Sequence, residues 1–179
     1  MNKQKRNLIL MAAAAAAVVL AVILIAVLGS TGRGSEKAIL TQYYTAMYAE
    51  NGGGMDAVVD CLVPDRQQSY YDTATAGGTN FNQMMAWRVE AMSMVGDNVR
   101  VTVDILSVSA ESASDLAQVR QTYSNAQRCR TVAFRLTLTG DQSSQEFVGV
   151  MPMVCLDGRW YMTDTDAGLK RVVNEETGE

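Results

Sequence analysis

The chain has 179 residues, of which 48% are hydrophobic and 19% are charged, and its 15 Lys and Arg are outnumbered by 19 Asp and Glu. Histidine is absent, which excludes Ser-His and Cys-His nucleophile pairs, histidine zinc sites and the usual acid-base group at neutral pH. The acidic balance argues against a nucleic acid or an anionic membrane surface as partner.

The first element is an uninterrupted apolar run over residues 8–28, without charge or proline. As a helix, these 21 residues reach ~31 Å, close to the ~30 Å hydrocarbon core of a bilayer. The sequence therefore predicts a transmembrane helix over 8–28, followed by a Gly-rich linker over 29–34. A cleaved signal peptide is the alternative, because Val27-Leu28-Gly29 offers small residues near a cleavage position.

Charge placement predicts the orientation of this span. Lys3, Lys5 and Arg6 precede it, so residues 1–7 are expected to stay in the cytoplasm and the rest of the chain to lie outside. The expected location is the cell membrane, with a single span. The remaining residues suffice for one domain over 35–173, with an acidic, frayed tail over 174–179.

Four helices are expected next. Ser35 is placed to cap the first, which ends at Asn51-Gly52-Gly53-Gly54, and helical spacing puts a stripe of large side chains on one face: Leu40, Tyr43, Tyr44, Met47 and Tyr48. A second helix over 55–62 is expected to stop at Pro64. A third helix, with a weaker pattern, is expected over 65–72. The fourth covers 80–95, and Gly96-Asp97 ends it.

The pattern then changes to period two over 99–105, which predicts a strand with one wet face. A helix over 115–125 and three strands over 129–139, 146–156 and 159–164 complete the order. Asp157-Gly158 predicts a type I′ hairpin that sets Cys155 opposite Trp160 and Met153 opposite Met162. With helices first and most strands last, the fold class is α+β, with helices packed on a curved antiparallel sheet.

Three segments carry a resemblance to a known group: Gly96-Asp97-Asn98-Val99-Arg100-Val101, the helix with Ser114-Asp115-Leu116, and Cys155-Leu156-Asp157-Gly158-Arg159-Trp160-Tyr161-Met162. Over Ser35 to about Asp166 the chain resembles membrane-anchored bacterial domains of the nuclear-transport-factor-2-like, or cystatin-like, superfamily. The resemblance implies a cone-shaped fold whose helices close the concave face of a bent sheet, often over a pocket. It implies no activity, because this fold hosts enzymes and binding modules alike.

Aromatic and Met side chains are candidates for the lining of such a pocket, since Met suits an adaptable apolar surface. The candidates are Tyr44, Tyr48, Trp87, Met151, Met153, Trp160 and Met162. Their periodic positions also fit plain core packing. No metal or cofactor site is expected.

The sequence offers only weak candidates for catalytic residues and for metal ligands. Asp104 and Arg135 lie within strand patterns and are the candidates for a carboxylate-based enzyme, although alternation puts Asp104 on the wet face. Asp164 and Asp166 flank Thr165 and are candidate oxygen ligands for a cation, or simply solvated carboxylates. No catalytic constellation emerges, so the expectation is a protein that is not an enzyme.

A disulfide between Cys129 and Cys155 depends on the register of two strands. One register sets these residues opposite each other, whereas a shift by one residue sets Arg130 opposite Cys155 and forbids the bridge. Both stay open, because each face of the 146–156 strand is partly apolar.

The preferred hypothesis is a single-span domain outside the cell that binds an envelope protein or a second copy of itself. Capture of a small apolar ligand or peptide in the pocket is the alternative, and an enzyme is the third. Small residues at 12–17 permit close packing of two spans.

Overall fold

The computed structural model describes residues 35–48, 54–75 and 79–172. The expected N-terminus (1–7), transmembrane helix (8–28), linker (29–34) and tail (174–179) lie outside these residues. Within them, no helix combines the length and apolar character needed to cross a bilayer. The described residues after Ser35 belong to one folded unit.

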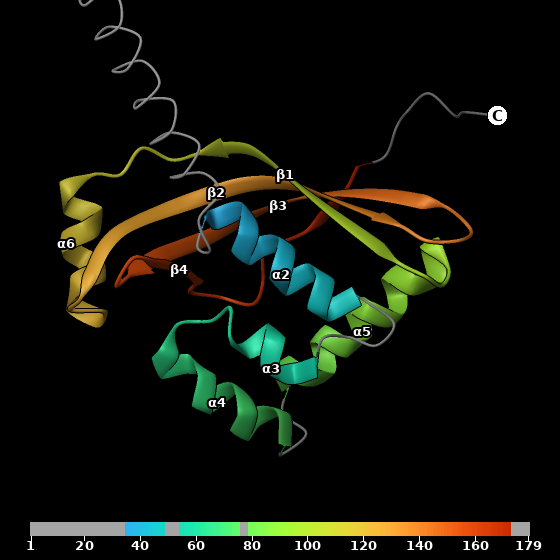
Figure 1. Ribbon diagram of the computed structural model, residues 1–179, viewed down its shortest axis with the longest axis horizontal. Helices are drawn as coiled ribbons and strands as arrows, with labels where there is room; N and C mark the ends of the chain where they lie inside the picture. The colour runs from blue at the N-terminus through green and yellow to red at the C-terminus, as the bar shows by residue number, and fades with distance from the viewer. Residues whose placement is uncertain (1–34, 49–53, 76–78, 173–179) are drawn as a thin grey trace, which may run out of the picture. The chain divides into compact units, whose positions relative to one another are not determined.

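This unit is a mixed α+β fold built on a curved antiparallel sheet (Figure 1). The strands β1 to β4 neighbour one another in chain order, and β5 pairs with β3. Their bounds are β1 Arg100–Val108, β2 Ala126–Thr139, β3 Ser144–Leu156, β4 Arg159–Met162 and β5 Lys170–Arg171. The described helices are α2 Glu36–Tyr48, α3 Gly54–Val59, α4 Pro64–Thr75, α5 Thr79–Val95 and α6 Ala113–Thr122.

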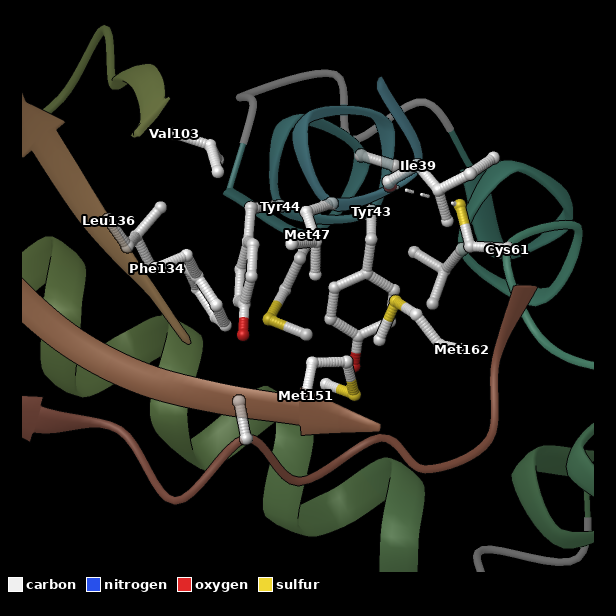
Figure 2. Close-up of a cluster of buried hydrophobic side chains, with 14 of the residues drawn as sticks. Ile39, Tyr43, Tyr44, Met47, Cys61, Val103, Phe134, Leu136, Met151 and Met162 are labelled. Carbon is white, nitrogen blue, oxygen red and sulfur yellow. Dashed lines mark hydrogen bonds between the residues drawn. The ribbon is translucent and has the colours of Figure 1, made fainter. Parts of the chain in front are cut away.

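Helix α2 supplies the centre of the core. Its predicted stripe is confirmed, because Leu40, Tyr43, Tyr44, Met47 and Tyr48 are all buried. They pack on one face of the sheet, here called the inner face, which carries Val103, Phe134, Leu136, Leu138, Met151, Met153 and Met162. Figure 2 shows Tyr43 and Tyr44 extending from α2, with Tyr44 beside Phe134.

A second, smaller core lies on the outer face of the sheet. Leu116 and Val119 of α6 pack there against a buried group formed by Val63, Ala126, Val154 and Leu156. Ser112 explains why α6 begins before the predicted residue 115, because its side chain accepts a hydrogen bond of 3.0 Å from the Asp115 amide and caps the helix. The β3 strand is therefore buried on both faces near its C-terminus.

The hairpin between β3 and β4 is confirmed. Asp157 and Gly158 have φ angles of 49° and 81°, as a type I′ turn requires. The register pairs Cys155 with Trp160 and Met153 with Met162.

The register between β2 and β3 differs from both expected alternatives. The turn holds only four residues, 140–143, between the paired residues Thr139 and Ser144. Both expected registers need a longer turn. The four-residue turn sets Cys129 opposite Val154, and Arg128 opposite Cys155.

Further element boundaries differ from the prediction. Pro64 begins α4 instead of stopping the preceding helix, which already ends at Val59; a proline fits the first helical turn, where its missing N–H is not needed. Strand β1 continues through a bulge to Val108. Strand β5 has only two residues, too few for any periodicity to reveal it.

Candidate functional site

A pocket of about 460 Å³ opens between α2, α5 and the chain segment that follows β4. Such a volume suits a small organic ligand, since binding pockets span roughly 300–1,000 Å³. Its lining is Tyr44, Met47, Tyr48, Trp87, Glu90, Ala91, Met94, Phe147, Thr165, Asp166, Ala167, Gly168, Leu169 and Arg171. The lining thus combines apolar and aromatic side chains with polar groups that form almost half of its accessible surface.

Aromatic rings form one wall of this pocket. The rings of Tyr44 and Tyr48 stack with centroids 6.2 Å apart and planes 10° from parallel, because the two residues lie one helical turn apart on α2. Tyr44 also contacts Tyr43 edge to face at 5.1 Å and Phe134 at 5.5 Å. These contacts fix the Tyr44 ring in position.

The two tyrosines bring hydroxyl groups to this wall. Within the described residues, the hydroxyl groups of Tyr44 and Tyr48 form no hydrogen bond with the protein, whereas Tyr43 donates one of 3.2 Å to the Thr165 carbonyl. Burial raises the pKa of both Tyr44 and Tyr48, the latter to about 12. Negative charge adds to these shifts, from Asp166 on Tyr44 and from Glu90 on Tyr48. Both phenols are therefore neutral donors at physiological pH.

Charged groups line the pocket as well. Glu90 comes from α5, Asp166 from the segment after β4, and Arg171 from β5. Asp166 Oδ1 accepts a hydrogen bond of 2.7 Å from the Gly168 amide, which holds its carboxylate in place. None of these three side chains forms an ion pair within the described part of the chain.

Three of the seven predicted pocket residues, Tyr44, Tyr48 and Trp87, line this pocket. The other four do not. Met151, Met153 and Met162 are core residues with at most 2% of their surface exposed. All three belong to the core of the inner face, and Figure 2 shows Met151 and Met162 beside the tyrosines of α2.

Trp160 lies away from the pocket. It pairs with Cys155 near the C-terminal end of β3, whereas Phe147, which lines the pocket, lies near the other end. The guanidinium groups of Arg128 and Arg130 are each 5.5 Å from the centre of its ring. Arg130 also forms a 2.6 Å ion pair with Glu36. The tryptophan is therefore part of the packing between α2 and this end of the sheet.

Most of the polar lining was not predicted from the sequence. Glu90 follows Trp87 by three residues on α5, so helical spacing alone would place both on neighbouring positions of one face. By contrast, residues 165–171 reach the pocket through backbone pairing, with the Val150 amide donating to the Ala167 carbonyl at 2.9 Å. No sequence pattern signals this segment.

The two residues considered for an enzyme lie outside the pocket. Asp104 and Arg135 are directly opposite each other on β1 and β2. Asp104 forms a 3.2 Å ion pair with Lys37, and Arg135 lies 3.6 Å from Glu146. All four side chains are at least 43% exposed, so the expected wet face is confirmed for Asp104.

The candidate cation ligands are occupied by backbone contacts. Asp164 Oδ1 accepts hydrogen bonds from the amides of Thr165 and Asp166, at 2.7 and 3.2 Å. Both carboxylates are exposed. Among the described residues, no three acidic or cysteine side chains are grouped as metal ligands.

The three cysteines are free thiols. The observed register sets Cys129 on the outer face with Val154, and sets Cys155 on the opposite face with Trp160. Burial raises the pKa of each thiol. The register that would have joined Cys129 to Cys155 is therefore wrong.

We expect three reactive thiols per chain when the purified, unreduced protein is unfolded in guanidinium chloride and titrated with a thiol reagent. The native protein should react slowly, because all three side chains are buried and hold their protons. A count of one thiol, restored to three by a reductant, would contradict the observed register.

The chain matches no protein-family model, no curated protein and no solved structure.

Proposed function

We propose that this chain is a binding protein whose folded domain takes a small organic ligand into the pocket between α2 and α5. The observation that carries this proposal is the 460 Å³ pocket itself, with its aromatic wall and the polar groups that lie beside it. Ligand sites in proteins share this composition, since apolar surface supplies affinity and sparse polar groups fix orientation.

The hydroxyl groups of Tyr44 and Tyr48 support the same reading. Neither hydroxyl forms a hydrogen bond with the protein within the described residues, and neither is closed off completely, since no fully buried side-chain oxygen or nitrogen there lacks a partner; both are therefore accessible donors for a ligand acceptor. The folded domain thus gains a polar contact when a ligand enters. Docking to an envelope protein or to a second copy remains the sequence-based alternative.

The place of action follows from the sequence of the N-terminal region. Residues 8–28 act as a single membrane span, residues 1–7 stay in the cytoplasm, and the binding domain is displayed outside the cell. The arrangement of helices on a curved antiparallel sheet is compatible with membership of the nuclear-transport-factor-2-like superfamily. In this role the domain binds without catalysing a reaction.

The pocket can be tested directly, because the chain has only two tryptophans and one of them lines it. The full chain, purified in a maltoside detergent and labelled with 5-fluorotryptophan, is expected to give two ¹⁹F resonances. Trp87→Phe and Trp160→Phe assign them. In a screen of small organic compounds, ligands should shift the Trp87 resonance and leave that of Trp160 in place.

A blocking variant sharpens this screen. Ala91 is 4% exposed and lines the pocket, so Ala91→Leu extends a side chain into it, whereas Ala86→Leu changes an exposed position of the same helix. We expect Ala91→Leu to weaken binding at least tenfold and Ala86→Leu to leave it unchanged. If no compound shifts Trp87, or if Ala91→Leu binds normally, the pocket is not the binding site.

The proposed location has its own test. The intact protein should stay with the membrane fraction after alkaline carbonate washing, and protease added to intact cells should digest its domain. Recovery of a soluble chain that begins near Ser30 would instead favour the cleaved signal peptide.

A further inference from the structure

Two carboxylates lie at the pocket without a basic partner. Glu90 and Asp166 both line it, and neither forms an ion pair within the described residues. Some other acidic side chains of the fold are paired, as in Arg130 with Glu36 at 2.6 Å and Arg159 with Asp60 at 2.6 Å. The lining therefore carries two exposed carboxylates that have no ion-pair partner among the described residues, together with one arginine, Arg171.

A buried polar side chain reaches into the same pocket. Tyr44 has 2% of its surface exposed, and within the described residues its hydroxyl has no hydrogen-bond partner. Asp166 acts on this phenol electrostatically, and Glu90 acts on that of Tyr48, in both cases opposing ionisation. The carboxylates thus lie close enough to shape the potential inside the pocket, which disfavours an anion and favours a cation.

The aromatic wall attracts cations for a separate reason. The faces of tyrosine and tryptophan rings carry negative charge density, so an ammonium group within about 6 Å of a ring centre is stabilised. Tyr44, Tyr48 and Trp87 place three such rings along the pocket. Rings of this type together with carboxylates form a setting suited to alkylated ammonium groups.

We propose that the ligand is a small organic cation, whose ammonium group lies near Glu90 and Asp166 and whose apolar body packs against Tyr48 and Trp87. This inference rests on the proposed function, since it names the chemical class that the pocket takes. The apolar lining supplies area for the body of the ligand, and the two carboxylates supply its charge partner.

Arg171 is the basic residue of the lining. Its guanidinium forms no ion pair within the described residues, and it contributes one positive charge against two negative ones. For a cationic ligand Arg171 is unfavourable, whereas for an anionic ligand it would be the anchor. It therefore distinguishes the two charge classes.

Three probes with a common benzyl body test the charge preference: benzyltrimethylammonium, benzyl alcohol and phenylacetate. Each is titrated into the fluorotryptophan-labelled full chain while the Trp87 resonance is followed. We expect the cation to bind at least tenfold more tightly than the neutral and anionic probes. The preference should weaken as salt is raised, because mobile ions screen the carboxylates.

Variants then assign the charge partners. Glu90→Gln and Asp166→Asn are each expected to weaken binding of the cation roughly fivefold and to leave benzyl alcohol unaffected. Asn at 166 keeps an oxygen for the Gly168 amide. Asp164→Asn is the matched control, because it removes a nearby carboxylate that does not line the pocket, and it should change affinity less than twofold. Arg171→Gln should leave the cation's affinity equal or stronger.

Equal binding of the cation and the neutral probe, tighter binding of phenylacetate, or loss of cation binding in Arg171→Gln would each overturn the inference. In those cases a shifted Trp87 resonance still shows that the pocket takes ligands. Absence of binding by all three probes also overturns it, and the wider compound screen then decides whether the pocket binds anything.

Discussion

Phe134→Ala is expected to destabilise the domain by about 3–5 kcal/mol. Phe134 is fully buried on the inner face, with its ring centre 5.5 Å from that of Tyr44. Across the strand pair it lies opposite Gly149, where an added methyl group would sit 3.2 Å from the Phe134 ring. Glycine has no side chain to fill the space left by the ring, so the variant keeps a cavity.

Chemical unfolding of the full chain, followed by circular dichroism, measures this loss. With a slope of about 1–3 kcal/mol per molar urea, a loss of this size lowers the midpoint by roughly 1–5 M. Val150→Ala is the matched control on the neighbouring strand, because Val150 is on the outer face and 49% exposed. Its effect should stay within about 0.5 kcal/mol. Similar midpoints for both variants would contradict the position assigned to Phe134.

The parts of this fold that sequence predicts are those determined by local chemistry. The stripe on α2 follows from helical spacing of large apolar side chains, since one face of such a helix must be buried. The register of β3 with β4 follows from Asp157-Gly158, because a two-residue turn leaves only one alignment of its strands.

The register of β2 with β3 was not predictable from pattern. Val154 and Leu156 are buried on the outer face by α6, while Met153 and Cys155 are buried on the inner face. A strand covered on both sides loses the alternation that distinguishes one register from the next. The turn between β2 and β3 is longer than the two-residue turn between β3 and β4, so it permits several alignments of its strands.

Only part of the pocket lining could be predicted from the sequence. Tyr44 and Tyr48 belong to the α2 stripe, so their approach to the sheet follows from the sequence. Asp166 and Arg171 reach the pocket only because the chain after β4 runs back along β3, with β5 pairing to Val148. A few backbone hydrogen bonds hold this segment beside β3. Its side chains show no periodic pattern that would predict the pairing.

Alkaline pH is expected to destabilise the domain strongly, between pH 9 and 12. Burial raises the pKa of Cys61 from 9.0 to about 12, and the charge of Asp60 adds to this shift. Burial, with the charge of Glu90, raises the pKa of Tyr48 from 10.0 to about 12. The pKa of Tyr44 is raised as well, first by its burial. The unfolded chain therefore loses these protons at lower pH than the folded domain does.

The direction of this effect follows from the number of protons that the folded and unfolded states bind. Below pH 9 both states hold these protons, so the full stability is present. As pH rises the unfolded state binds fewer protons than the folded state, and the free energy of unfolding falls. At ~1.4 kcal/mol for each pKa unit, Tyr48 accounts for about 3 kcal/mol and Cys61 for about 4 kcal/mol. Together they approach the whole stability of a typical domain, about 5–15 kcal/mol.

Urea unfolding of the full chain at a series of pH values from 8 to 11 measures this dependence. Tyr48→Phe keeps the stacked ring and removes the ionising group, so its stability should fall less steeply above pH 10. The stability of Cys61→Ala should fall less steeply above pH 9. This variant also loses the contacts of the thiol with the carbonyls of Ile39 (Figure 2) and Ala57.

Tyr161→Phe is the matched control, because Tyr161 packs with the small core on the outer face and its ring lies beside Arg159 at 5.0 Å. It shows how far the removal of a phenol outside the pocket changes the pH dependence by itself. If Tyr48→Phe and Tyr161→Phe lose stability in parallel, the Tyr48 phenol is not desolvated by the fold. The aromatic wall of the pocket would then be open to water, and its value as a binding surface would fall, because cation–π attraction weakens in water.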